Sequence, residues 1–94
     1  MATITDVRIR KIAKEGKLKA IVSIVLDNEI AIHEIKVIQG DDRLFVAMPS
    51  RKEEATGIFK DIVHPLSAKS RNEMETQILE EYKRYIETRD TENL

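Results

Sequence analysis

The chain has 94 residues, the size of one small domain, and contains no cysteine, which excludes disulfides, thiolate metal sites and cysteine nucleophiles. No apolar stretch reaches the length of a signal peptide or a membrane span, so we expect a cytoplasmic protein without a membrane partner. The formal net charge of −1 hides an asymmetry: residues 1–19 hold six cations and two acids, whereas residues 73–94 hold three cations and seven acids. One end of the chain can present a positive surface, although charges at this density also simply keep a small domain in solution.

Three antiparallel strands are predicted at the start of the chain, joined by tight turns. Each segment is rich in β-branched residues and either alternates in polarity or carries a continuous apolar face, as strands do. The segments are residues 3–12, 17–26 and 30–38. In the first strand Arg8 and Arg10 share the polar face, about 7 Å apart from the rise per residue, a distance that suits successive phosphates of a nucleic acid strand.

The second and third strands carry apolar side chains on both faces. Ile21 and Val25 lie opposite the main apolar face of the second strand. In the third strand, simple alternation puts Ile32 on one face and Ile35 on the other. A sheet that faces water on one side alternates more strictly than this. One helix can cover only one face, so we expect a homodimer in which a second copy covers part of the other.

A fourth strand is predicted at residues 43–48, after a turn that contains Gly40. Pro49 ends this strand because proline has no N–H to donate to a strand ladder. Residues 49–57 are predicted to form an exposed polar loop, and residues 58–63 a fifth strand.

The proline delivers a hydroxyl and two cations, Ser50, Arg51 and Lys52, from the end of the fourth strand. If the three leave the sheet together, they can bind a phosphate. Loops carry binding residues more often than other segments do. The alternative is that Pro49 and the charges only protect a sheet edge from pairing.

A capping box from Ser70 to Glu73 predicts the start of an amphipathic helix over residues 70–87. The apolar side chains at helical spacing are Met74, Ile78, Tyr82, Tyr85 and Ile86. Strands first and a helix last predict an α+β fold, a curved antiparallel meander of about five strands with one C-terminal helix packed on it. Residues 1–88 then form a single domain, and residues 89–94 a polar tail that frays.

Catalysis, a cofactor, a metal site and a small-molecule substrate are not expected. His33 is predicted to bond a neighbouring strand, and His64, which precedes Pro65, to bond local backbone. No nucleophile motif accompanies them, and two histidines without cysteine make a poor zinc site. Phe45 and Phe59 are expected in the core, which argues against a platform on which nucleic acid bases stack.

Five blocks of this sequence, in this order, resemble the SpoVG (stage V sporulation protein G) family over roughly residues 4 to 87. They read ITDVRIRK, LKAIVSIVLDNE, IHEIKVI, LFVAMPS followed by a basic pair, and FKDIVHP. The resemblance implies a small α+β domain that dimerises through its sheet. It also implies a cytoplasmic DNA-binding regulator, with RNA binding in some members, that affects septation, sporulation and gene expression.

The resemblance also implies which residues contact nucleic acid, and two departures from the family pattern modify that set. Glu53 and Glu54 follow the basic pair and oppose a phosphate unless they fold away, whereas Arg43 adds a cation where the family commonly has glycine. The candidate contacts are Arg8, Arg10, Arg43, Ser50, Arg51, Lys52, Lys69 and Arg71.

Two functions stay open at this point. The first is a dimeric nucleic-acid-binding regulator. The second is a protein–protein interaction module that uses its dimer surface or its acidic helix and does not bind nucleic acid directly. Binding of mixed genomic fragments at low and moderate salt distinguishes the two.

Overall fold

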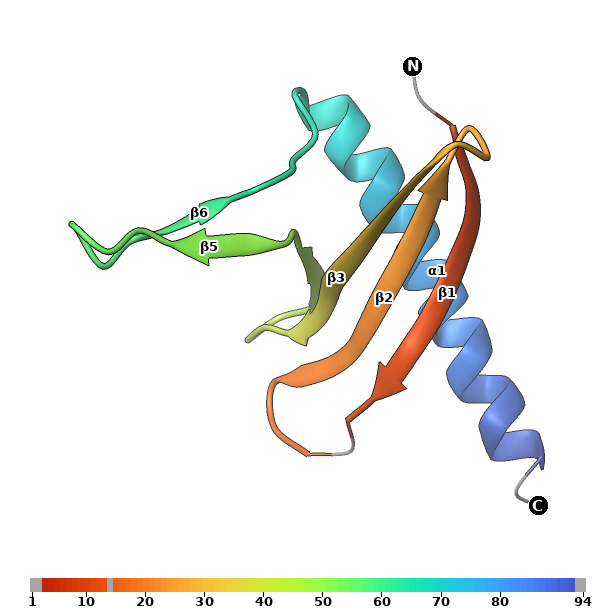
Figure 1. Cartoon of the computed structure of the whole chain (residues 1–94). Coiled ribbons are helices and arrows are strands. Elements are labelled where there is room, and N and C mark those ends of the chain that lie inside the picture. The colour runs from red at the N-terminus through yellow and green to blue at the C-terminus, as the bar shows by residue number, and fades with distance from the viewer. Residues whose placement is uncertain (1–2, 14, 93–94) are drawn as a thin grey trace.

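Four antiparallel strands form the main sheet, in the order in which they occur along the chain (Figure 1). The computed structural model describes residues 3–13 and 15–92, and for 89–92 it describes the backbone only. The strands are β1 (Ile4–Ile12), β2 (Leu18–Leu26), β3 (Ile30–Gln39) and β4 (Leu44–Ala47). This arrangement confirms the predicted meander and the α+β class.

The two remaining strands form a separate hairpin and do not join the main sheet. β5 (Ser50–Lys52) pairs with β6 (Phe59–Asp61), where a polar loop and a fifth strand of the main sheet were predicted. The hairpin, residues 50–61, is called the arm below. Its base is closed by the Ile62 N–H donating to the Pro49 carbonyl at 2.8 Å. Because β5 is entirely polar, periodicity gave no sign that it is a strand.

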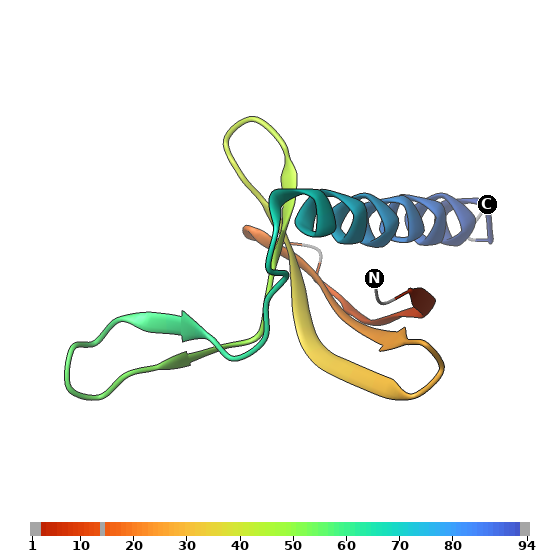
Figure 2. The same ribbon diagram turned by 90° about the horizontal axis from the view of Figure 1, so that it is seen from above.

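One long helix, α1 (Ala68–Glu92), packs on one face of the main sheet and leaves the other face uncovered (Figure 2). The uncovered face is called the open face below. The core between sheet and helix consists of Ala20, Val22, Ile24, Ile35, Val37, Val46, Met48 and Ile78. Met74 and Tyr82 of the helix pack against this core, which with Ile78 confirms the central part of the predicted stripe; Leu79, which was not predicted, packs there too, and the predicted Tyr85 is exposed.

The helix begins earlier than predicted because Ser67, not Ser70, is its N-cap. The Ser70 N–H donates to Ser67 Oγ at 3.1 Å, and the Arg71 N–H donates to the Ser67 carbonyl at 3.0 Å. The predicted capping box was therefore wrong. Just upstream, His64 Nδ1 lies 2.9 Å from the Pro65 carbonyl, a contact with local backbone as predicted. The helix also runs past the predicted end at residue 87, to Glu92, and residues 93–94 of the predicted tail lie outside the described residues.

A bulge in β3 changes which of its side chains face the core. Val22 pairs with Ile35 and Ile24 pairs with Ile32, so two residues of β3 lie opposite one residue of β2. Glu34, inside the bulge, has a positive φ of 63°. A bulge shifts strand alternation by one residue, so Ile32 and Ile35 share the core face. Their predicted placement on opposite faces was wrong, and the apolar content of the open face is correspondingly smaller.

Replacing Ser67 by alanine tests the observed cap. We expect Ser67→Ala to lower the free energy of unfolding by about 1 kcal/mol, because it removes the acceptor for a backbone N–H at the helix start. Ser67→Asp keeps an acceptor there and should stay close to the parent. Urea unfolding at one fixed protein concentration measures both, and equal stability of the alanine variant and the parent would show that Ser67 does not cap the helix.

Candidate nucleic-acid interface

The open face carries exposed cations on β1 and β3. Ile21 of β2 pairs with Lys11 on one side and with Lys36 on the other, so two cations flank an apolar side chain in one row across the sheet. In the next row Arg8 pairs with Ser23. Arg8 and Arg10 are both exposed, whereas Val7 and Ile9 pack on the core, as the alternation of β1 predicts.

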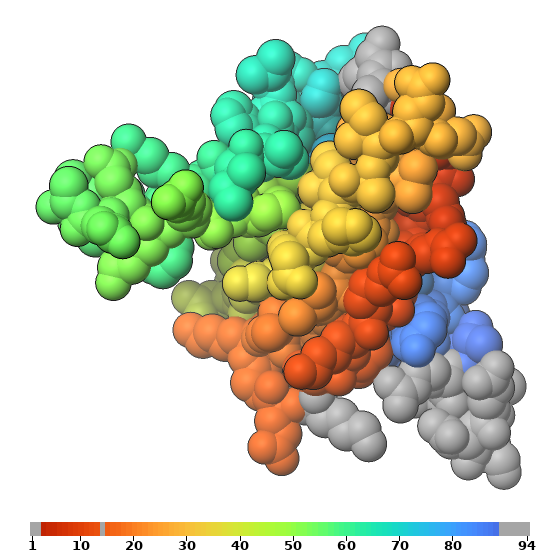
Figure 3. All heavy atoms as spheres, in the orientation of Figure 1, coloured from red at the N-terminus to blue at the C-terminus, as the bar shows by residue number. Residues whose placement is uncertain are grey.

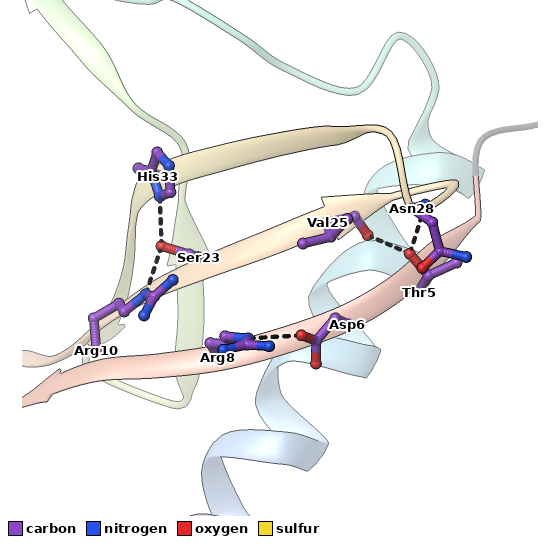
Figure 4. Close-up of polar contacts among 8 residues, drawn as sticks. All are labelled: Thr5, Asp6, Arg8, Arg10, Ser23, Val25, Asn28 and His33. Atoms are coloured by element: carbon purple, nitrogen blue, oxygen red, sulfur yellow. Dashed lines mark hydrogen bonds and ion pairs between the residues drawn. The ribbon is translucent and has the colours of Figure 1, made fainter.

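Ser23 connects two of the basic side chains of the open face (Figure 4). Arg10 Nε donates to Ser23 Oγ at 3.3 Å, and Ser23 Oγ lies 2.8 Å from His33 Nδ1. Ser23 is only 4% exposed although it lies on the face without a helix. His33 thus bonds a neighbouring strand, as predicted. The contacts hold Arg10 and His33 close to the sheet surface.

Arg8 is held by a different partner. Its Nε donates to Asp6 Oδ2 at 2.7 Å, and both side chains are exposed. This hydrogen bond lowers the pKa of Asp6 below its ordinary value of 3.8 and raises the pKa of Arg8. The charge of Arg8 is therefore partly balanced in the free protein, and a phosphate that binds here competes with Asp6.

The arm places its two predicted cations on opposite faces. Arg51 pairs with Lys60, and Lys52 pairs with Phe59. Neighbouring residues of a strand point to opposite sides, so Arg51 and Lys60 share one face, and Lys52 and Phe59 the other. Ser50 lies opposite Asp61 on the second face. The structure therefore does not gather the hydroxyl and both cations at one point. Lys60, which the sequence analysis missed, becomes the neighbour of Arg51 once the register of the hairpin is known.

The two glutamates that follow the basic pair have different surroundings. Lys60 Nζ lies 2.8 Å from Glu53 Oε2, so Glu53 is neutralised by a cation of the arm. Glu54 is exposed in the turn at the tip. The negative charge of Glu53 is thus turned toward Lys60, but the same contact occupies a cation that could otherwise bind phosphate.

The remaining predicted residues lie near the start of the helix. Arg43 Nη2 is 3.5 Å from Glu75 Oε1, and Arg71 lines a small hollow together with Glu75. Lys69 is exposed in the first helical turn. This group belongs to the helix side of the sheet, so the structure separates it from Arg8 and Arg10.

The arm and the open face lie on the same side of the molecule. In Figure 2 the helix occupies one side of the main sheet, and the arm projects past the sheet on the other side. The space-filling view shows the arm as a lobe that stands off from the body (Figure 3). The eight candidate residues therefore fall into three groups, of which the open-face and arm groups face the same region of solvent.

Phe59 is not a core residue, contrary to the prediction. It is 67% exposed because the arm does not pack on the main sheet. Phe45 is half-buried next to Gly40. An exposed aromatic side chain opposite a lysine therefore accompanies the cations of the arm.

Two further properties bear on function. Within residues 3–13 and 15–92, no helix combines the length and apolar character that crossing a membrane requires. Among the same residues, no three histidine, aspartate or glutamate side chains come together as a metal site.

Comparison with known proteins places the chain in a family. A family model described as SpoVG matches residues 2–84. The chain belongs to the SpoVG family. A relative from Clostridium botulinum, named "Putative septation protein SpoVG", is 57% identical over 89 residues, which cover 95% of this chain and 97% of the relative.

Two other relatives carry the same name as the Clostridium botulinum protein. The one from Clostridium novyi is 60% identical over 79 residues, covering 84% of this chain and 78% of the relative. The one from a Thermoanaerobacter species is 54% identical over 81 residues, covering 86% and 87%. These matches confirm the SpoVG resemblance found in the sequence.

The contact between Arg8 and Asp6 predicts an acid-sensitive pair. Because the folded-state pKa of Asp6 is lowered, the contribution of the pair to stability is present above the ordinary pKa and is lost as the pH falls through the lowered one. Arg8→Ala should raise the pKa of Asp6, and Arg10→Ala should change it less. NMR titration of the Asp6 carboxyl group measures this, and equal shifts in the two variants would contradict the specific pairing.

Proposed function

We propose that this SpoVG-family chain is a homodimeric nucleic-acid-binding regulator of septation, sporulation and gene expression. It acts in the cytoplasm and catalyses no reaction. Its ligand is DNA, with RNA as a second ligand. The observation that carries the proposal is the placement of exposed cations on the open face and on an arm that projects on the same side. The septation name of the relatives supports the cellular role.

Phosphate binding suits both groups of cations. Side chains of arginine and lysine that contact phosphates position a protein on nucleic acid without reading its sequence. The row of Lys11 and Lys36 spans three strands, about 10 Å at ordinary strand spacing. A two-stranded ribbon such as the arm also has the width that the major groove of DNA admits.

A catalytic role has little support from the described residues. Ser23 and His33 have the spacing of a nucleophile and its base, 2.8 Å. Ser23, however, is buried, and Arg10 also donates to its oxygen. We therefore assign this contact to the positioning of Arg10 and His33 on the open face.

A second candidate function is protein–protein interaction, and a specific observation favours it. Phe59, Ile62 and Leu66 are large apolar side chains that are more than half exposed. An interaction module would use this surface and show no affinity for nucleic acid. Fluorescence anisotropy with mixed duplex fragments distinguishes the two, because only the regulator gives binding that weakens with salt.

Neutralising the cationic face of the arm should change the salt dependence of DNA binding. Each phosphate contact contributes about 0.9 to the slope of log K against log salt. Arg51→Ala/Lys60→Ala removes up to four contacts in a dimer. We expect the slope to flatten by about two to four units, and affinity to fall alike for all sequences.

Lys83→Ala/Arg84→Ala, which removes two exposed cations from the helix, is the matched control and should leave the slope near that of the parent. Arg8→Ala/Arg10→Ala tests the open face separately. The arm and helix variants should keep their stability to within about 0.5 kcal/mol, since the altered side chains are exposed. The open-face variant also loses the contacts with Asp6 and Ser23, so its stability is measured together with its affinity. An arm variant with the slope of its parent would exclude the arm as a phosphate contact.

The ion pair between Glu53 and Lys60 predicts that removing an acidic side chain of the arm strengthens DNA binding. Glu53→Gln removes a carboxylate and frees Lys60, so DNA affinity should rise and the salt slope should steepen by up to about one unit per arm. Glu54→Gln removes the same charge from the tip without freeing a lysine. Anisotropy titrations at several salt concentrations compare the two. If Glu54→Gln strengthens binding more than Glu53→Gln, Lys60 is not a contact.

A further inference from the structure

The arm exposes apolar surface that a small hairpin cannot cover by itself. Its strands pack chiefly on each other, and all six of their residues are exposed. Phe59 is 67% exposed and Ile62, at the root, is 65% exposed. A single two-stranded hairpin is at best marginally stable in water. The arm therefore has the character of an element that is completed by contact with another surface.

The same chain carries an apolar groove that is open to solvent. It lies between the first turns of α1, the end of β2, the start of β3 and residues 63–66, which belong to the connection from the arm to the helix. Leu26, Ile32 and Met74 are partly buried core residues that line it. Leu66, on its edge, is 94% exposed. Between the sheet and the first helical turns, the core is therefore incompletely covered.

We propose that the arm of one copy lies in this groove of a second copy, and that the second copy does the same in return. The inference rests on the homodimer of the proposed function and specifies its interface. Phe59 is the anchor, and the groove formed by Leu26, Ile32 and Met74 receives it. Each binding site then needs two chains, because the groove comes from one copy and the arm that fills it comes from the other.

Continuity along the chain supports a reciprocal contact. The arm and the groove of one chain are joined by residues 62–66, of which Val63 to Leu66 line the groove. In a two-fold dimer the same surface patch serves both subunits, so an arm and a groove that lie next to each other can form one continuous reciprocal interface. The exposed side chains of Ile62 and Leu66 then belong to the same interface as Phe59.

The charges do not oppose this contact. The Phe59 face of the arm carries Lys52 and Asp61, one charge of each sign, and Glu73 lines the groove, where Lys52 can pair with it. The open face, the other large uncovered surface, carries the exposed cations Arg8, Arg10 and Lys36, which suit the apolar Phe59 less than the groove does. The groove is therefore the better binding site for the arm.

A second copy of the chain accounts for more of the exposed apolar surface of the arm and its connection to the helix than stacked nucleic acid bases do. Bases stack on aromatic side chains, and this accounts for Phe59 alone. Ile62, Val63 and Leu66 are aliphatic and extend the apolar surface away from the arm toward the groove. One occupant, another copy of the same chain, covers the arm and the groove together.

Cross-linking between different copies tests the contact, since the chain has no cysteine of its own. Ser50→Cys marks the Phe59 face of the arm, and Gln77→Cys marks the groove while leaving the apolar contacts in place. The two variants, with tags of different mass, are mixed and treated with a short bis-maleimide. We expect a product that joins the two variants. Replacing Gln77→Cys by Lys83→Cys, outside the groove, should give little product.

The anchor is tested by self-association of the full chain, measured by light scattering over a range of concentrations. Phe59→Ala should weaken dimerisation at least tenfold, as the loss of a central aromatic anchor does. Ile58→Ala is the matched control, because Ile58 lies across from Glu53 on the other face of the arm and should matter less. A parent that is monomeric throughout, or arms that cross-link only to each other, would overturn the inference.

The outcomes separate this inference from the proposed function. If the parent gives the arm-to-groove product but binds no DNA, the proposed function is wrong and the proposed interface is supported. If the parent binds DNA as a dimer without that product, the proposed function is supported and the proposed interface is wrong. If Phe59→Ala leaves dimerisation unchanged and weakens binding of a single-stranded oligonucleotide, Phe59 stacks with nucleic acid bases and the inference is wrong.

Discussion

The packing of one helix on one face of a four-stranded sheet determines the rest of the structure. Ile78 of α1 is fully buried against Val22 and Ile24 of β2 and Ile35 of β3. The helix also contacts β1 and β4, so all four strands of the main sheet share one core with α1, and the arm does not join it. A chain of this size buries only about 60–65% of the surface that its unfolded form exposes. With α1 committed to one face, the protein leaves the open face, the arm and the groove beside the first helical turns accessible to solvent, and these surfaces are available for binding.

Irregularities in the strands decide what the open face presents. The bulge at Glu34 turns Ile32 and Ile35 to the same side, so the core gains an apolar side chain that strict alternation would leave outside. In another irregularity, between Ile9 and Lys11, Arg10 is the extra residue of β1. Bulges re-aim side chains locally. The open face consequently combines basic side chains with a few half-buried apolar ones, a composition that suits a polar ligand better than a second hydrophobic sheet.

The sequence alone predicted the strands and the helix whose apolar residues recur at a regular spacing. Strict alternation placed Val7 and Ile9 inside and Arg8 and Arg10 outside, and the helical spacing of Met74, Ile78 and Tyr82 identified the packed side of α1. These patterns depend on which side chains are buried, so they can be read without a structure.

The features that could not be predicted depend on contacts between segments. Ser50 to Lys52 have no apolar face, and only the pairing with β6 makes them a strand. Phe59 looked like a core residue because its apolar character does not reveal that the segment leaves the main sheet. Lys60 became a candidate only through its register with Arg51. For the same reason the candidate site was predicted as a list of basic residues, whereas its division into three groups required the fold.

The alternation of a strand allows one short arm to serve two partners. Arg51 and Lys60 lie on one face, and Lys52 and Phe59 on the other. In the proposed dimer the Phe59 face is covered by the second copy, which leaves the Arg51 face directed to solvent and to phosphate. Ordering the arms in this way also fixes the distance between the two basic faces. Two such faces held together bind one nucleic acid more tightly than either does alone, without any new contact, because the second association becomes intramolecular. In this proposal, a chain with one small core couples its assembly to the strength of its binding through a single hairpin.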